Sequence, residues 1–228
     1  MLAERSPVRR LAMLLQMASP MLPVGAYAYS QGIERGVHDG WILSADDAQR
    51  WIVDALAGPI ARWEAPVWLR LYRAFADGDE DTFGEWNARF IASRETSELR
   101  AETLQMGASL ASLARDLRMP AGDSLPAISE LSFPAAFAAC AATAVIEEQD
   151  GLAAYVWSWT ENQVAAALKA VPLGQVAGQR LLLAVHAPLE DAVRTALRLE
   201  DDELVSGAPG LTLSSALHEV QYSRLFRS

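Results

Sequence analysis

Apolar side chains recur at helical spacing along much of this chain of 228 residues. Ser44 and Asp47 are suited to cap a first helical turn. The apolar stripe that follows them consists of Ala48, Trp51, Ile52, Ala55 and Leu56. Because residues three and four positions apart share one face of a helix, this stripe predicts a helix that packs on a core.

Pro59 interrupts the pattern, because proline lacks the N–H that would continue the helical hydrogen bonds. The apolar stripe resumes at Ile60, Trp63, Val67 and Leu71 and ends near Gly78. The sequence therefore predicts either a kink at Pro59 or a second helix that starts there.

Two longer helices are predicted downstream. An apolar stripe ends where Pro120 and Gly122 break the pattern, and it consists of Leu99, Met106, Leu110, Leu113 and Leu117. The segment from Tyr155 to Leu168 begins with a strand-like alternation, but it continues without a turn signal and favours a helix.

A further helix is predicted around Pro188, which suits a first helical turn. Glu190 and Asp191 follow at the positive end of the helix dipole, and Arg194 and Arg198 lie towards its negative end. No pair of β-branched runs flanks a tight turn, and no internal repeat appears. We therefore predict an all-α fold, a compact bundle of about eight to ten helices.

Composition limits the kinds of partner. Residues 1–228 are expected to form one domain, with residues 1–8 flexible. The formal net charge of −10 and the pI near 4.8 argue against the broad basic surface that binds phosphate backbones. Nucleic acid is not an expected partner.

The single cysteine, Cys140, lies among alanines and is predicted to be a small buried residue without a disulfide partner. The apolar run over residues 134–146 is too short for a bilayer, which needs about 20 residues. Arginines and an apolar run near the N-terminus resemble a secretory leader, but Gln16, Pro20 and Pro23 interrupt that pattern. We expect a cytoplasmic protein that does not span a membrane.

Catalytic motifs are missing from the sequence. It contains no phosphate-binding loop, dinucleotide fingerprint or nucleophile elbow. His38, His186 and His218 are scattered, and the acidic residues at 147, 148 and 150 are typical of a solvated helix end. We expect no catalytic residue, no metal site and no cofactor.

Three segments depart from the helical pattern. The first, residues 19–34, holds two prolines and is unusually apolar for a loop; we call it the Pro-Gly loop. It is either a buried connector whose Tyr27 and Tyr29 fill core space or a presented surface with tyrosines as contact anchors.

The second segment, residues 169–180, starts at the only lysine of the chain, and we call it the Lys169 corner. Pro172 is predicted to start a helix, on which Gly174 and Gly178 permit a tight helix crossing; the alternative is an exposed basic and polar corner. The third segment, residues 218–228, is the tail, which either packs on its own domain or becomes ordered against a partner.

These three segments read SPMLPVGAYAYSQGIE, KAVPLGQVAGQRLL (residues 169–182) and HEVQYSRLFRS, and they resemble signature stretches of the UreF family of urease accessory proteins. Their order and spread along the chain match the family. Ala28 and Val220 depart slightly from its pattern. The resemblance implies a compact all-helical protein that forms a homodimer.

The resemblance also implies partners: UreD (also called UreH), the GTPase UreG and, through their complex, the urease apoprotein. It implies that the GTPase-docking face contains Tyr27, Glu34, Lys169 and Arg224. It implies that the tail, residues 218–228, becomes ordered when the UreD-type partner binds, through Gln221, Tyr222, Leu225, Phe226 and Arg227. The residues that shape the motifs are Pro23, Gly25, Gly32, Pro172, Gly174 and Gly178.

The sequence thus leads to one main hypothesis and two alternatives. The main hypothesis is a non-enzymatic scaffold that assists nickel insertion into urease. The first alternative is a direct regulator of the UreG GTPase, in which Arg224 stabilises transition-state charge. The second is a small helical ligand-binding protein, which a deep pocket with convergent polar groups would favour.

Overall fold

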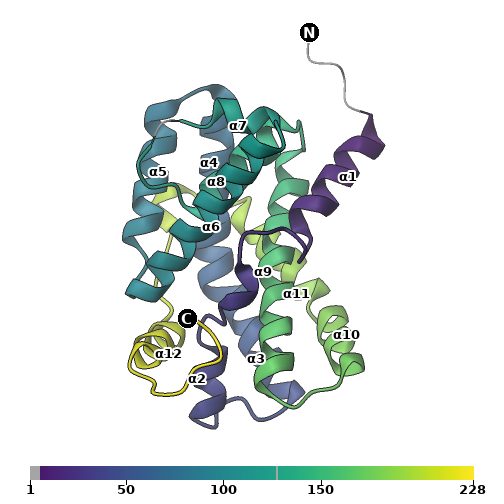
Figure 1. The fold of residues 1–228 in the computed structure, drawn as a ribbon, viewed down its shortest axis with the longest axis vertical. Coiled ribbons are helices and arrows are strands. Elements are labelled where there is room, and N and C mark those ends of the chain that lie inside the picture. The colour runs from purple at the N-terminus through teal and green to yellow at the C-terminus, as the bar shows by residue number, and fades with distance from the viewer. Residues whose placement is uncertain (1–5, 127) are drawn as a thin grey trace.

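The computed structural model describes residues 6–126 and 128–228, and within these ranges the regular elements are all helical (Figure 1). The α-helices are α1 (Pro7–Ala18), α2 (Ile33–His38), α3 (Ala45–Ala55), α4 (Ala65–Asp77), α5 (Glu80–Ala92), α6 (Ser97–Asp116), α7 (Pro120–Ser124), α8 (Phe133–Thr143), α9 (Glu148–Ala170), α10 (Gln175–Ala184), α11 (His186–Ala196) and α12 (Pro209–Glu219). Short 3-10 turns lie at Ala26–Ala28 and Asp201–Glu203, and a π-helical segment covers Leu56–Glu64. The predicted all-α class is confirmed.

The predicted number of helices agrees with the longer elements. Of the helices in the described ranges, α2 has six residues and α7 has five, and the other ten have ten or more. The two short helices have no extended apolar stripe, which is why the sequence pattern did not reveal them.

Two central helices organise the core. The apolar run in α8 is buried from Pro134 to Ala141, and α8 packs between α4 and α6. The long helix α9 crosses the middle of the molecule and contacts α1, α2, α3, α10 and α11 (Figure 1). Cys140 is buried in α8 as predicted, and burial raises the pKa of its thiol to about 12.

Aromatic rings join α8 and α9 to α4. Trp68 of α4 lies edge-on to Phe137 of α8, with ring centroids 6.4 Å apart, and is stacked on Tyr155 of α9 at 6.2 Å. Such pairs add to the free energy gained from burial alone. The hydroxyl of Tyr155 donates a hydrogen bond of 2.7 Å to the carboxylate of Glu64.

At Pro59 the structure has a kink. Gly58 leaves the helical region with φ −97° and ψ −106°, and the helix continues through the π-helical segment into α4. Proline removes one helical hydrogen bond and crowds the preceding turn, which accounts for the wider turn at this position.

The predicted helix ends are confirmed where local chemistry sets them. The hydroxyl of Ser44 accepts a hydrogen bond from the Asp47 N–H, and Gly78 ends α4 in the left-handed region with φ +71°. One prediction was wrong in detail: α6 ends at Asp116, and Pro120 opens the short helix α7 instead of terminating α6.

Pro7 begins α1, while residues 1–5 lie outside the described residues. No helix in the described part of the chain is both long and apolar enough to cross a membrane.

The packing of α6 against the segment that leads into α8 depends on Gly107. A Cβ atom at Gly107 would lie only 2.1 Å from the carbonyl oxygen of Leu131. We expect Gly107→Ala to lower the free energy of unfolding by about 1–3 kcal/mol, because backbone must move to admit the methyl group. Urea-induced unfolding measures this change.

Gly84 in α5 is the matched control, since nothing lies within 4 Å of a Cβ placed there. Gly84→Ala should raise stability by up to about 1 kcal/mol, because alanine is the better helix former. Equal effects of the two substitutions would contradict the close approach at Gly107.

Candidate partner-binding site

The tail folds back along the Pro-Gly loop. The backbone N–H of Ser30 donates to the carbonyl oxygen of Ser228 at 2.8 Å, and the N–H of Arg227 donates to that of Ala28 at 2.8 Å. Phe226 is only 6% exposed, whereas Leu225 is 74% exposed and Tyr222 is fully exposed. The tail therefore packs on its own chain while two of its apolar side chains face outward.

Glu34 holds the tail to α2. Its Oε1 accepts a hydrogen bond of 2.6 Å from the N–H of Leu225, and its Oε2 accepts one of 2.9 Å from that of Phe226. The sequence resemblance implied that Glu34 belongs to a docking face. In the structure Glu34 is only 6% exposed and its carboxylate is occupied by the tail amides, so little of this side chain is available for direct contact with another protein.

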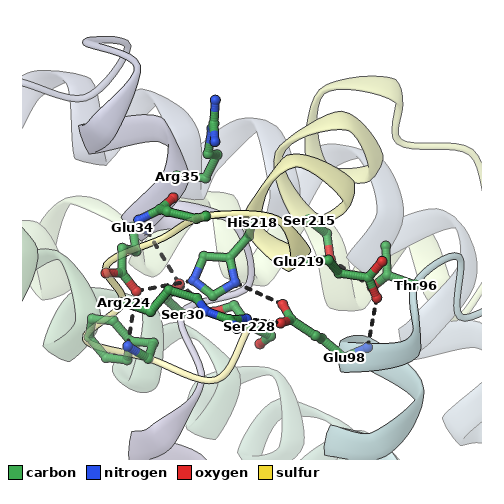
Figure 2. Close-up of polar contacts among 12 residues, drawn as sticks. Ser30, Glu34, Arg35, Thr96, Glu98, Ser215, His218, Glu219, Arg224 and Ser228 are labelled. Atoms are coloured by element: carbon green, nitrogen blue, oxygen red, sulfur yellow. Dashed lines mark hydrogen bonds and ion pairs between the residues drawn. The ribbon is translucent and has the colours of Figure 1, made fainter.

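His218 lies between two carboxylates (Figure 2). Its Nδ1 is 2.7 Å from Oε2 of Glu98, and its Nε2 is 3.1 Å from Oε2 of Glu34. The guanidinium of Arg224 in the tail pairs with the other oxygen of Glu98. Three charged side chains and the His218 ring thus link α2, α6 and α12 to the tail.

The end of α12 is joined to the start of α6 by a second set of contacts. Glu219 accepts hydrogen bonds from the backbone N–H and the hydroxyl of Ser97, which hold the pKa of its carboxyl below the usual range. Beside them, the hydroxyls of Thr96 and Ser215 are 2.8 Å apart. These contacts fix the position of the residue preceding Glu219, which is His218.

Lys169 connects all three motif segments. Its ammonium nitrogen lies 5.6 Å from the ring centroid of Tyr27 in the Pro-Gly loop and 5.4 Å from that of Phe226 in the tail. Both distances are within the range of cation–π attraction. Lys169 also donates a weak hydrogen bond to the carbonyl oxygen of Tyr27 at 3.4 Å.

The Pro-Gly loop fits both of its predicted descriptions in part. Tyr29 is buried and fills core space, while Tyr27 is 71% exposed. Gly25 and Gly32 have φ of +84° and +88°, values that favour glycine. Gly32 also lies against the side chains of Trp51 and Ser214, so its missing Cβ permits close packing. Pro23 is exposed in the same loop.

The prediction that Pro172 starts a helix was wrong. The backbone is not helical from Val171 to Gly174, and α10 begins at Gln175 with Gly174 as the preceding cap. A Cβ at Gly178 would lie 2.7 Å from the side chain of Leu168 in α9, so a tight crossing exists there. Nothing lies within 4 Å of a Cβ at Gly174.

Glu102 of α6 receives the end of the tail and was missed by the sequence reasoning. Its carboxylate accepts hydrogen bonds from the Gln31 amide at 2.8 Å and from the Ser228 hydroxyl at 3.0 Å. Burial raises the pKa of Glu102 to about 7, and the two hydrogen bonds only partly oppose this shift. The sequence did contain a sign that Glu102 is buried, because it lies between Leu99 and Met106 on the apolar face of the predicted helix.

A cavity of about 270 Å³ opens beside this network. Its walls are mainly apolar and come from α1, the Pro-Gly loop, α6, α9 and α10. Gln31, Glu64, Arg94, Glu102 and Tyr155 supply polar groups to it. In the described ranges, no cluster of three or more histidine, cysteine or acidic side chains is arranged to hold a metal ion.

Comparison with known proteins identifies the family. Residues 42–186, more than half of the chain, match the family model described as UreF. The chain is 48% identical over 226 residues to the urease accessory protein UreF of Methylobacillus flagellatus, covering 98% of this chain and 100% of that protein. The chain belongs to the UreF family.

Two further relatives called urease accessory protein UreF agree with this assignment. That of Janthinobacterium sp. (strain Marseille) is 49% identical, over 94% of this chain and 96% of the relative. That of Azoarcus sp. (strain BH72) is 51% identical, over 94% of each chain. The family resemblance noted in the sequence is thereby confirmed. The residue roles that it implied for this UreF-family chain remain predictions.

The raised pKa of Glu102 predicts how stability depends on pH. Between pH 4.5, its ordinary pKa, and about 7, the folded chain keeps a proton that the unfolded chain loses, so stability falls as pH rises. Glu102→Gln removes this effect. We expect the stability of the variant relative to the native chain to rise by up to about 1.4 kcal/mol per pH unit in that window.

Urea unfolding at pH 5, 6, 7 and 8 measures the difference. Glu190→Gln, at an exposed position of α11, is the control and should give a difference with little pH dependence. A constant difference between Glu102→Gln and the native chain over this range would show that Glu102 is ionised in the folded state.

Proposed function

We propose that this chain is a urease accessory protein that scaffolds a complex with a UreD (UreH)-type protein and a UreG-type GTPase during maturation of the urease nickel centre. Its relatives carry the name urease accessory protein. The observation that supports a scaffolding role best is the meeting of Tyr27, Lys169 and Phe226 from three distant segments. In this proposal nickel and GTP are handled by the partners.

In this proposal the exposed side chains of the tail and those around Lys169 bind different partners. Tyr222 and Leu225 project from a tail whose backbone is already fixed, so they can contact the UreD-type partner at low cost in conformational entropy. Tyr27 and Lys169 form the adjoining surface for the GTPase, since an exposed aromatic ring with a cation at its face suits a binding hot spot. We further propose that the chain acts as a cytoplasmic homodimer and reaches urease through this complex.

Co-purification with UreD-type and UreG-type proteins tests the two surfaces separately. We expect the pair Tyr222→Ala and Leu225→Ala to reduce recovery of the UreD-type protein at least tenfold, because each lost anchor costs about 1 kcal/mol or more. Both side chains are exposed, so the fold should be unaffected. Lys169→Ala should reduce recovery of the UreG-type protein in the same way.

Two matched controls are used. Leu213→Ala on α12 removes an exposed leucine, and Arg180→Ala on α10 removes an exposed cation; neither residue contacts Tyr27 or Phe226 as Lys169 does. Both should leave recovery unchanged. Full recovery of both partners with all the tail and Lys169 variants would overturn the scaffold proposal. A chain truncated before His218 is a harsher test, because it also removes the buried residues Phe226 and Ser228.

Direct regulation of the GTPase is a second candidate, favoured by the partial exposure of Arg224. Its guanidinium is paired with Glu98 yet its side chain is 38% exposed. If Arg224 stabilises charge in the transition state, Arg224→Ala should lower stimulated GTP hydrolysis by about 10³-fold or more. Equal rates of hydrolysis with the native and variant chains, at saturating concentrations of each, would remove this role.

The ligand-binding alternative has the cavity beside Glu102 in its favour, since polar groups converge at one part of an apolar enclosure. Family membership weighs against it as the main role. Occupation of the cavity by a cellular small molecule that survives purification, detected by native mass spectrometry, would support this alternative.

A further inference from the structure

Gln31 is the one residue of the Pro-Gly loop other than glycine with a left-handed backbone, at φ +47°. Elsewhere in the described ranges, Arg118 and Val145 are the non-glycine residues with positive φ, and each directly follows the C-cap of a helix. A left-handed residue there is a common way for a helix to end. Gln31 lies just before α2, so no helix ending accounts for its backbone. A side chain makes this conformation unfavourable, and it persists only where surrounding contacts hold it.

The side chain of Gln31 supplies such contacts by joining two helices. Its Nε2 donates a hydrogen bond of 2.8 Å to Oε1 of Glu102 in α6, and its Oε1 accepts one of 2.6 Å from the indole N–H of Trp159 in α9. The donor and the acceptor of one amide are thus both used. Glycine would adopt the same backbone without strain but would make neither contact. The side chain of Gln31 therefore does something that glycine at this position could not do.

The segment that Gln31 holds carries Tyr27. Tyr27 lies in the 3-10 turn Ala26–Ala28, which the left-handed Gly25 precedes. Gly32, also left-handed, follows Gln31, so flexible glycines bound the segment at both ends. Because such glycines do little to restrict the backbone between them, side-chain contacts must fix the position of the turn.

We propose that Gln31 is a positioning residue for the Pro-Gly loop: by joining Glu102 to Trp159, it fixes the turn that presents Tyr27 for partner binding. The step from Gln31 to the turn concerns this chain alone, whereas the step from Tyr27 to a GTPase rests on the proposed function. The tail is not needed for the first step, because the Ser228 hydroxyl bonds the other oxygen of Glu102.

A fixed turn favours binding for a general reason. A loop that is already ordered loses less conformational entropy when a partner binds it. If the turn is loosened, the binding-competent conformation is less populated and the apparent Kd rises in proportion. Loss of the Gln31 contacts should therefore change both the mobility of the turn and the affinity for the partner.

Hydrogen exchange at the Ala28 and Tyr29 amides tests the first step. These amides donate the hydrogen bonds of 3.0 and 3.1 Å that close the turn. We expect Gln31→Ala to raise both exchange rates at least about tenfold, because the loss of two hydrogen bonds lets the turn open more often. Amides of α8 should keep their native rates. The control is Gln149→Ala, a change at an exposed glutamine of α9, which should leave all of these rates unaltered.

An interchange of the two paired side chains tests their contact directly. At pH 8, above the Glu102 pKa of about 7, Gln31→Glu alone sets two carboxylates against each other and should loosen the turn. Glu102→Gln alone should have little effect, because its amide oxygen can still accept from Gln31. Gln31→Glu combined with Glu102→Gln again pairs a donor with an acceptor, and Trp159 can still donate to position 31. We expect the double variant to restore both exchange rates to within about threefold of native values.

The second step is measured as the affinity of a UreG-type protein for the chain in complex with a UreD-type protein. Tyr27→Ala is the reference variant, since it removes the presented ring. We expect Gln31→Ala to raise the Kd by about tenfold, as the loosened turn populates the binding conformation less. The double variant should recover most of the native affinity.

Three results would overturn the inference. Ala28 and Tyr29 could exchange at native rates in Gln31→Ala, or the double variant could exchange as fast as Gln31→Glu. The third is native affinity for the UreG-type protein in Gln31→Ala when Tyr27→Ala weakens binding. Should Gln31→Ala fail to fold, the comparison of Gln31→Glu with the double variant still decides.

The inference and the proposed function can fail separately. If Tyr27→Ala leaves the affinity for the UreG-type protein unchanged, the proposed docking surface is wrong. The exchange rates at Ala28 and Tyr29 then decide the role of Gln31 by themselves.

Discussion

The position of the tail depends on one carboxylate, that of Glu34. Its two oxygens accept the N–H groups of Leu225 and Phe226, two successive backbone donors of a segment without regular structure. A buried carboxylate satisfied by several donors is both stable and specific in geometry. Once these two amides are fixed, the Leu225 side chain faces outward and the Phe226 side chain inward. The inward ring reaches Lys169, and the outward side chain joins the exposed surface.

The surroundings of Glu34 explain why the three motif segments, which are far apart in the sequence, lie together in the structure. The left-handed backbone at Gly32 turns the chain into α2, which places Glu34 in the first turn of a helix that packs on α9 and α12. The Pro-Gly loop, the Lys169 corner and the tail are therefore three parts of one polar and aromatic assembly. A change in one segment alters the contacts of the other two.

Sequence reasoning succeeded where a few neighbouring residues determine the structure. The stripe after Ser44 and the turn at Gly78 are local, and both have the predicted form. It was less successful at Pro172, because proline at the start of a helix and proline just before a capping glycine have the same local signal. The roles of Glu102 and His218 depend on partners about 71 to 184 positions away, such as Gln31 and Glu34, and no spacing rule reports such contacts.

The burial of the only cysteine has a practical consequence for studying the tail. Nucleophilic attack requires a thiolate, and burial raises the pKa of the Cys140 thiol to about 12, while the side chain is only 1% exposed to a reagent. Maleimide or iodoacetamide reagents should therefore not modify the native thiol of the folded chain. A cysteine introduced at a solvent-facing position would be modified selectively, so a fluorophore or spin label can be attached there without first removing Cys140.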